Sequence, residues 1–184
     1  MALSAKNKRK AIDKVLVSLG VVVTLVLLGI GGLAWWTHSF ISTTVTTELS
    51  AQKIYFPPLG NPALDSPEIG PYLNQYAGKQ LLTGPEAKAY ANHFIAVHLT
   101  EIAGGKTYSQ VSALSLADPS NLALKAQAQT LFQGETLRGL LLGDAYAFAT
   151  VGQIAQIVAI ILFIGGGVML LFVLLGLAHL ARTT

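Results

Sequence analysis

The sequence predicts an all-α membrane protein, with two transmembrane helices and a helical extracytoplasmic domain between them. Two long stretches, residues 15–36 and residues 151–177, contain no charged side chain. The segments between them carry helix-capping signals and helical apolar spacing, and no strand pattern of convincing length. Of the 184 residues, 52% are hydrophobic and 11% are charged, a balance that a soluble domain of this size would rarely show.

The first charge-free stretch, residues 15–36, is long enough to cross a bilayer. It has about 22 residues and gives roughly 33 Å of helix, against a hydrocarbon core of about 30 Å. Basic residues beside a span remain on the cytoplasmic side, so the N-terminus is expected inside. The basic residues of the preceding tail are Lys6, Lys8, Arg9, Lys10 and Lys14, opposed only by Asp13. Because the apolar core of a cleaved signal peptide has only about 7–15 residues, a signal anchor is the better interpretation.

The second charge-free stretch ends close to Arg182, which places the C-terminus inside as well. The expected division is a basic cytoplasmic tail (1–14), a transmembrane helix (15–36), an extracytoplasmic helical domain (37–150), a second transmembrane helix (151–177) and a cytoplasmic tail (178–184). Acidic residues outnumber basic ones between the spans, so the basic character belongs to the tails. This distribution argues against a nucleic-acid partner and favours membrane lipid.

The first helix is predicted to continue beyond its span, because Ile41, Val45 and Leu49 recur at every fourth position. It should end before the Pro57-Pro58 pair, which imposes extended backbone. Residues 57–72 are predicted to form a connecting loop without regular structure. The side chains expected to attach this loop to the helices are Ile54, Phe56, Leu59 and Ile69.

Three further helices are predicted in the middle of the chain. Thr83 and Glu86 form a capping box for a helix that should run to about Ile102 and stop at two glycines. A second capping box at Thr107 opens a short helix to about residue 116. A third helix should begin near Ser120 and enter the second span unbroken, with a possible bend at Gly134, Gly139 or Gly143. The side chains expected to be mostly buried are Tyr90, Phe94, Val97, Leu131 and Leu137.

Small and amide side chains gather at the start of the second span. Transmembrane helices associate through close packing of small residues and through amide hydrogen bonds, so this face is predicted to contact another helix, within the chain or between chains. The predicted helix-contact residues are Gly152, Gln153, Ala155, Gln156 and Ala159. The glycines at 29, 31 and 32 and at 165–167 would allow the two spans to approach closely.

Few residues suggest chemistry. His93 and His98 are five positions apart and do not form the i, i+4 pair that holds a metal, although His98 and Glu101 share a helix face. The chain has no cysteine, no catalytic or nucleotide-binding motif, and no charged residue inside either span. We therefore expect no catalytic residue, no bound metal and no cofactor.

Four segments carry a resemblance to a known group of proteins. They are LSAQKIYFPP (49–58), YAGKQLLTGPEAKAYANHFIAVHL (76–99), GGKTYSQVS (104–112) and LFQGETLRGLLLGDAYAF (131–148). As a series they resemble a group of two-span actinobacterial membrane proteins, whose members are often labelled aromatic ring-opening dioxygenases. Such enzymes hold a metal with histidines and a carboxylate, and no spacing here supplies that set. The resemblance implies a Gram-positive envelope protein with both termini inside, and no particular activity.

The sequence leaves three functional hypotheses. The first is a non-catalytic membrane-anchored interaction or structural protein, either self-associating as a homo-oligomer or serving as an accessory subunit of a membrane protein complex. The second is a membrane-tethered metal-dependent enzyme that uses His93, His98 and Glu101. The third is a sensor whose extracytoplasmic domain binds a ligand. The lack of reactive groups favours the first hypothesis.

Overall fold

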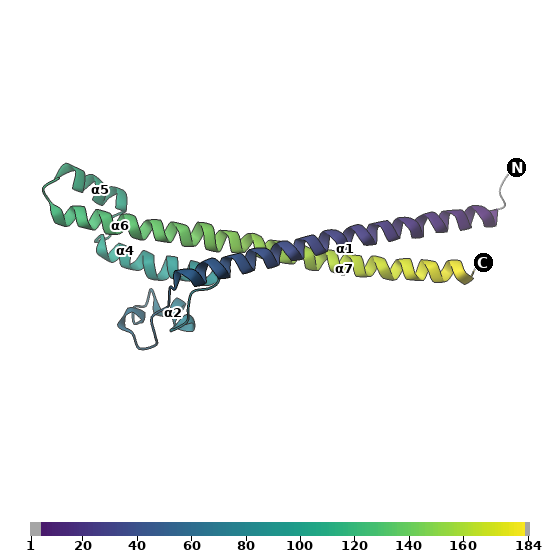
Figure 1. The fold of residues 1–184 in the computed structure, drawn as a ribbon, viewed down its shortest axis with the longest axis horizontal. Helices are drawn as coiled ribbons and strands as arrows, with labels where there is room; N and C mark the ends of the chain where they lie inside the picture. Colours follow the sequence, from purple (N-terminus) through teal and green to yellow (C-terminus); the bar gives the residue numbers. More distant parts are fainter. Residues whose placement is uncertain (1–4, 183–184) are drawn as a thin grey trace. The chain divides into compact units, whose positions relative to one another are not determined.

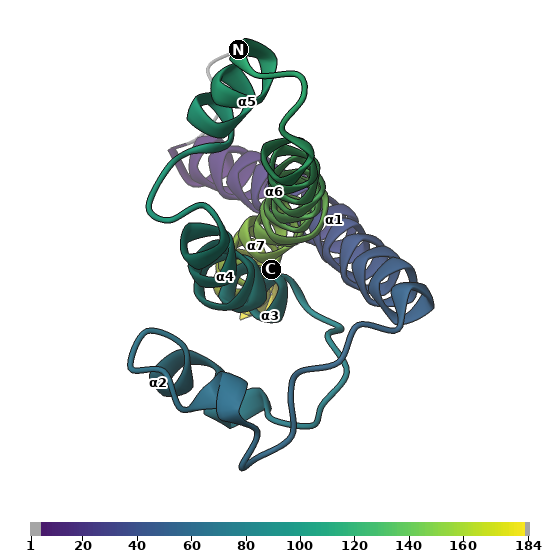
Figure 2. The ribbon, with the colours of Figure 1, turned by 90° about the vertical axis from the view of Figure 1, so that its left-hand side faces the viewer.

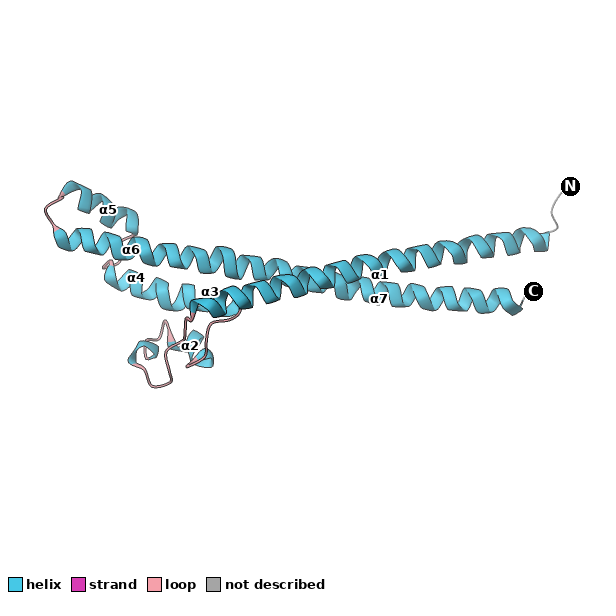
Figure 3. Cartoon of the chain, viewed as in Figure 1, coloured by secondary structure: helices cyan, strands magenta, loops and turns pink. Residues whose placement is uncertain are grey.

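The protein is described here by a computed structural model that covers residues 5–182, so the predicted cytoplasmic tails lie partly outside the described residues. Within this part of the chain the regular structure is helical, as Figure 3 shows, and a single bridge between Tyr55 and Gln80 is the only strand-like pairing. The chain divides into two compact units: residues 1–40 with 152–184, and residues 41–151. The second unit comprises almost the same residues as the segment predicted to lie between the spans, 37–150.

The first unit consists of parts of two long helices, α1 (Ala5–Gln52) and α7 (Phe148–Arg182). In this unit α1 and α7 lie side by side and antiparallel, so the start of α1 and the end of α7 are at the same end of the pair (Figure 1). Both helices are long and apolar enough to cross a membrane. Their most apolar windows are only 11% and 17% buried, unlike the core helices of a soluble protein.

The predicted extension of the first helix is confirmed. The run of Ser and Thr residues after Phe40 remains helical, because Ile41, Val45 and Leu49 are buried in the core of the second unit. α1 ends at Gln52, where Lys53 adopts a positive φ of 53° and the chain turns toward the proline pair.

The connection after α1 is more structured than predicted. It contains 3₁₀ turns over Pro62–Leu64 and Asn74–Tyr76, separated by the short helix α2 (Gly70–Leu73). Figure 2 shows α2 within this connection. Phe56 and Ile69 are buried, as expected for residues that attach the connection to the helices. The same expectation is wrong for Leu59, which is 75% exposed.

Both predicted capping boxes are confirmed. Thr83 accepts from the backbone N–H of Glu86 at the start of α3 (Gly84–Ala89), and Thr107 accepts from that of Gln110 at the start of α5 (Tyr108–Ala117). The helix begun by α3 continues through a π-helical stretch, Tyr90–Ile95, into α4 (Ala96–Ile102). α6 (Leu122–Leu140) begins after an Asn121 cap, slightly later than predicted, because the Asn side chain accepts from the N–H of Leu124.

The helix that begins with α6 is unbroken from Leu122 to Arg182, as predicted. Between α6 and α7 it passes through a second π-helical stretch, Leu141–Ala147, which contains Gly143, one of the predicted bend positions. In the second unit α4 and α5 pack against α6, and α3 packs against this π-helical stretch.

The core of the second unit corrects the predicted helix phase. The buried stripe that runs from α3 through the π-helical stretch to the end of α4 consists of Ala87, Ala91, Ile95, Leu99 and Ala103. Tyr90, Phe94 and Val97 are only partly buried. A spacing of four drifts around an α-helix, but the wider π-helical turn compensates for this drift and keeps the stripe on one face. Leu131 is buried as predicted, and the prediction for Leu137 is wrong, since its side chain is 38% exposed.

Candidate interaction surfaces

The interface between the two long helices of the first unit follows a seven-residue repeat. The buried residues of α7 are Gly152, Ala159, Gly166 and Val173, which are exactly seven positions apart. Gly20, Thr24 and Gly31 are buried on the facing side of α1. A strict seven-residue spacing is typical of helices that supercoil around each other. We call this interface the span seam.

Glycines bring the two helices close together in the span seam. A Cβ added to Gly20 would lie 2.9 Å from Cγ2 of Val173, and one added to Gly176 would lie 2.7 Å from Cγ2 of Val17. These distances are shorter than real Cβ contacts, so only glycine permits the observed packing. Small residues are how membrane helices achieve such contacts, since lipid provides little hydrophobic drive between them.

Only some glycines of the two predicted clusters are in close contact with the other helix. A Cβ on Gly31 would meet Phe163 at 3.0 Å, and one on Gly166 would meet Leu28 at 2.7 Å, so these two positions are close contacts. Gly29, Gly32 and Gly167 have open space at the same position. The sequence pattern therefore indicated the segments where the two helices come close. The rotation of each helix about its axis decides which glycine of a cluster faces the other helix.

Polar groups in the span seam are satisfied locally. The hydroxyl of Thr24, which is only 4% exposed, donates to the carbonyl of Gly20 at 2.8 Å. The ring Nδ1 of His38 lies 3.0 Å from the carbonyl oxygen of Gly152 and donates to it. Both bonds give a partner to a polar group that is shielded from water, where an unsatisfied donor is costly.

The five predicted helix-contact residues differ in burial, because they lie on different sides of α7. Gly152 and Ala159 are buried in the first unit, on the side of α7 that faces α1. The side chains of Ala155 and Gln156 are half-buried, and Gln153 is exposed. The structure thus places Gly152 and Ala159 of this face in the contact between the two helices of the chain.

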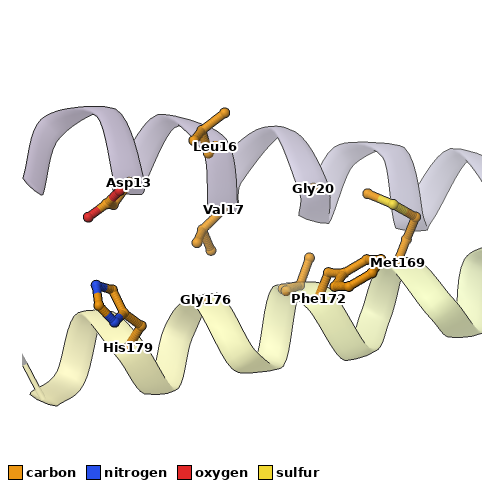
Figure 4. A pocket seen from close by; sticks show the side chains of 9 residues that line it. Asp13, Leu16, Val17, Gly20, Met169, Phe172, Gly176 and His179 are labelled. Carbon is orange, nitrogen blue, oxygen red and sulfur yellow. The ribbon is translucent and has the colours of Figure 1, made fainter. Parts of the chain in front are cut away.

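A cleft of about 310 Å³ lies between the helices at the end of the pair where α1 begins and α7 ends. Its floor includes Gly20 and Gly176, and Asp13 and His179 point toward one another across its mouth (Figure 4). The remaining walls are apolar and are formed by Leu16, Val17, Met169, Phe172 and Val173.

The second unit has an apolar groove of about 270 Å³ between the last turns of α1 and the helical stretch 137–148. We call it the outer groove. Leu140 is the most exposed of its large apolar residues, at 53%. Each wall also carries one carboxylate, Glu48 on α1 and Asp144 in the π-helical stretch. The other residues that line it are Thr44, Val45, Leu49, Gln52, Leu137, Leu141, Ala145 and Phe148.

Sequence reasoning missed the outer groove, because its two walls are far apart in the chain. One signal was available: Asp144 interrupts an otherwise apolar helical run that leads into the second span. The π-helical geometry around Asp144 had no recognisable signal. Such stretches widen a helix locally and occur often at functional sites.

The histidines of the enzyme hypothesis are engaged in other contacts. The ring of His93 stacks on Tyr72, with centroids 3.6 Å apart and an interplanar angle of 8°. Nδ1 of His98 lies 2.8 Å from the carbonyl oxygen of Phe94, and Glu101 is exposed. Among residues 5–182, no three His, Cys, Asp or Glu side chains gather in a way that could hold a metal ion.

Two tyrosines of the second unit have shifted pKa values. Burial raises the pKa of Tyr90 above its usual 10.0. The hydrogen bond that Lys88 donates to the Tyr146 hydroxyl, over 3.2 Å, lowers the pKa of Tyr146, and the positive charge of Lys88 adds to this effect. Tyr90 contacts Phe56 edge to face, and Tyr146 lies beside Lys88 on the surface, so each shift has a cause in the local packing.

Comparisons with protein-family models, curated proteins and solved structures gave no match. The resemblance to actinobacterial two-span membrane proteins therefore stays a prediction.

Proposed function

We propose that the chain is a non-catalytic, membrane-anchored interaction protein that serves as an accessory subunit of a membrane complex. In this proposal α1 and α7 cross the membrane as a hairpin, both termini are cytoplasmic, and residues 37–150 are extracytoplasmic. The basic tail before residue 15 and the two long apolar helices support this orientation. The observation that carries the proposed function is the outer groove, an exposed apolar surface on the second unit.

The span seam supports an anchoring role for the hairpin. Gly152 and Ala159 are occupied by a contact within the chain, so this face is not available to another protein. A partner would instead contact the second unit. Contiguous exposed apolar side chains are typical of protein-interaction sites, and Leu137, Leu140 and Phe148 form such a surface in the outer groove.

The geometry of the outer groove favours a helix as its occupant. Two neighbouring helices form its walls, with apolar side chains at helical spacing, and a third helix packs readily between such ridges. Because Glu48 and Asp144 both line this groove, the partner helix should carry Lys or Arg beside its apolar residues.

The same carboxylates disfavour a second copy of the chain as the occupant. A two-fold symmetric dimer would place the same surface of both copies in contact, and the acidic walls would then repel each other. Self-association through the outer groove is therefore less favourable than a complex with a basic partner.

Site-specific photo-crosslinking in cells tests the proposed function. A photoreactive amino acid at Leu140 in the outer groove should give one defined adduct, whose partner peptide is an apolar helix with basic residues. The matched control is Leu116, which is 77% exposed in the same unit but outside the groove, and it should give no such adduct.

Charge substitution gives a second readout. Glu48→Lys with Asp144→Lys should abolish the adduct at Leu140, because the basic partner would then be repelled. An adduct of twice the mass of the chain would instead support a homo-oligomer. Equal adducts from Leu140 and Leu116 would contradict a specific docking surface.

A further inference from the structure

We propose that the cleft between α1 and α7 binds one anionic phospholipid, with an acyl chain between the helices and the phosphate at the mouth. This inference rests on the proposed membrane insertion and orientation. Three features carry it: the shape of the cleft, its apolar walls and the cationic residues around its mouth.

The shape of the cleft follows from the two glycines. Gly20 and Gly176 line the cleft from opposite helices, and Val173 and Val17 occupy the space where their Cβ atoms would be, so the helices stay close at these two positions. Leu16 and Phe172, which are 60% and 62% exposed, stand at the sides of the cleft and open it toward the surrounding lipid. The apolar volume of about 310 Å³ has the chemistry of an acyl chain and offers no donor or acceptor along its walls.

Only the mouth of the cleft is polar. Asp13 and His179 face one another there (Figure 4). Lys10 precedes Asp13 by three positions and Arg182 follows His179 by three, so both cations lie on the helix faces that border the mouth. With the neighbouring Lys14, the basic side chains outnumber the single carboxylate, and an anionic phosphate is the complementary group.

The position of the mouth agrees with this ligand. In the proposed orientation the mouth lies at the cytoplasmic edge of the hydrocarbon core, where phospholipid headgroups are found. Basic clefts between membrane helices on this side of the bilayer are suited to anionic headgroups. A second copy of the chain would bring the same cations together, and this repulsion disfavours it as the occupant.

Photoreactive lipids test the inference on the full chain in nanodiscs. The probe is phosphatidylglycerol with a diazirine in one acyl chain, and phosphatidylcholine with the same chain is the matched lipid control. Adducts of the phosphatidylglycerol probe should concentrate on Leu16 and Phe172. They should exceed by about tenfold the adducts on Leu25 and Ile161, which are equally exposed, at 65% and 62%, but lie outside the cleft.

A charge variant tests the role of the headgroup. Lys10→Gln with Lys14→Gln and Arg182→Gln should reduce labelling of the cleft to the level of the phosphatidylcholine probe, without changing helicity. Uniform labelling of all four apolar positions, equal labelling by the two lipids, or a crosslink between two chains would overturn the inference. Extraction of the protein from membranes by alkaline carbonate would instead contradict the proposed membrane anchoring itself.

Discussion

The span seam makes a sharp prediction at two adjacent glycines of α1. A Cβ on Gly31 would lie 3.0 Å from Cε1 and 3.1 Å from Cδ1 of Phe163, and 3.3 Å from Cβ of Leu162. An aromatic ring and a Cβ atom cannot move away as easily as the end of a flexible side chain. The same Cβ on Gly32 would meet nothing within 4 Å. Gly31→Ala should therefore disturb the helix pair, and Gly32→Ala should not.

The magnitude follows from the difference between the two variants. Both gain the same helix propensity, about 0.8–1 kcal/mol for replacing glycine by alanine, so this contribution cancels. Overpacking at a closely packed position costs about 1–3 kcal/mol. The free energy of unfolding of Gly31→Ala should be lower than that of Gly32→Ala by about this amount.

The assay uses the absence of native cysteine in the chain. Dyes on cysteines introduced at Lys8 and Arg182 report the separation of the helices by energy transfer during titration with sodium dodecyl sulfate. Gly166→Ala and Gly167→Ala form a second matched pair on α7, because only Gly166 is in close contact. If Gly31→Ala is as stable as Gly32→Ala, the two helices are not packed as described.

Three predictions concern the second unit, and thermal unfolding followed by circular dichroism measures each of them. Phe56 is 2% exposed and its ring contacts Tyr76 and Tyr90, so Phe56→Ala should cost about 3–5 kcal/mol; a cost below about 1 kcal/mol would place it on the surface. Thr83→Ala removes the acceptor of the first capping box and should cost about 0.5–2 kcal/mol, whereas Thr83→Ser should cost less. Burial raises the pKa of Tyr90 in the folded state above its value of 10.0 in the unfolded chain. The contribution of the neutral Tyr90 side chain to the free energy of unfolding is therefore complete below pH 10.0, and it is lost as the pH rises through the pKa of the folded state. Tyr90→Phe should therefore unfold less readily than the parent above pH 10, and identical alkaline profiles would contradict this.

Local signals predicted much of the fold. The capping boxes at Thr83 and Thr107 consist of residues three positions apart, so they can be recognised without knowing the tertiary structure. The same applies to the end of α1 before two prolines and to the unbroken helix from Leu122 to Arg182, where no proline occurs.

Features that depend on tertiary packing could not be predicted in this way. The buried stripe from Ala87 to Ala103 requires the π-helical stretch Tyr90–Ile95, which packs against α6 and α2. At Gly84 an added Cβ would clash with Cβ of Ala149, a contact between segments that are far apart in the sequence.

In the candidate sites too, local composition could be read from the sequence, whereas the contacts that depend on tertiary packing could not. The small-residue composition near Gly152 predicted a helix contact, but its partner, α1 of the same chain, depends on how the helices pair. The outer groove joins Glu48 to Asp144, and only the folded chain brings these carboxylates to one groove.

Single-cysteine labelling of intact cells tests the proposed membrane hairpin most directly. The chain has no cysteine, so each introduced position is read without background. A membrane-impermeant maleimide should label Leu116→Cys on intact cells, and it should label Lys8→Cys and Arg182→Cys only after the membrane is permeabilised. Labelling of either terminal position on intact cells, or of Leu116→Cys only after permeabilisation, would contradict a hairpin that holds both termini inside and the second unit outside.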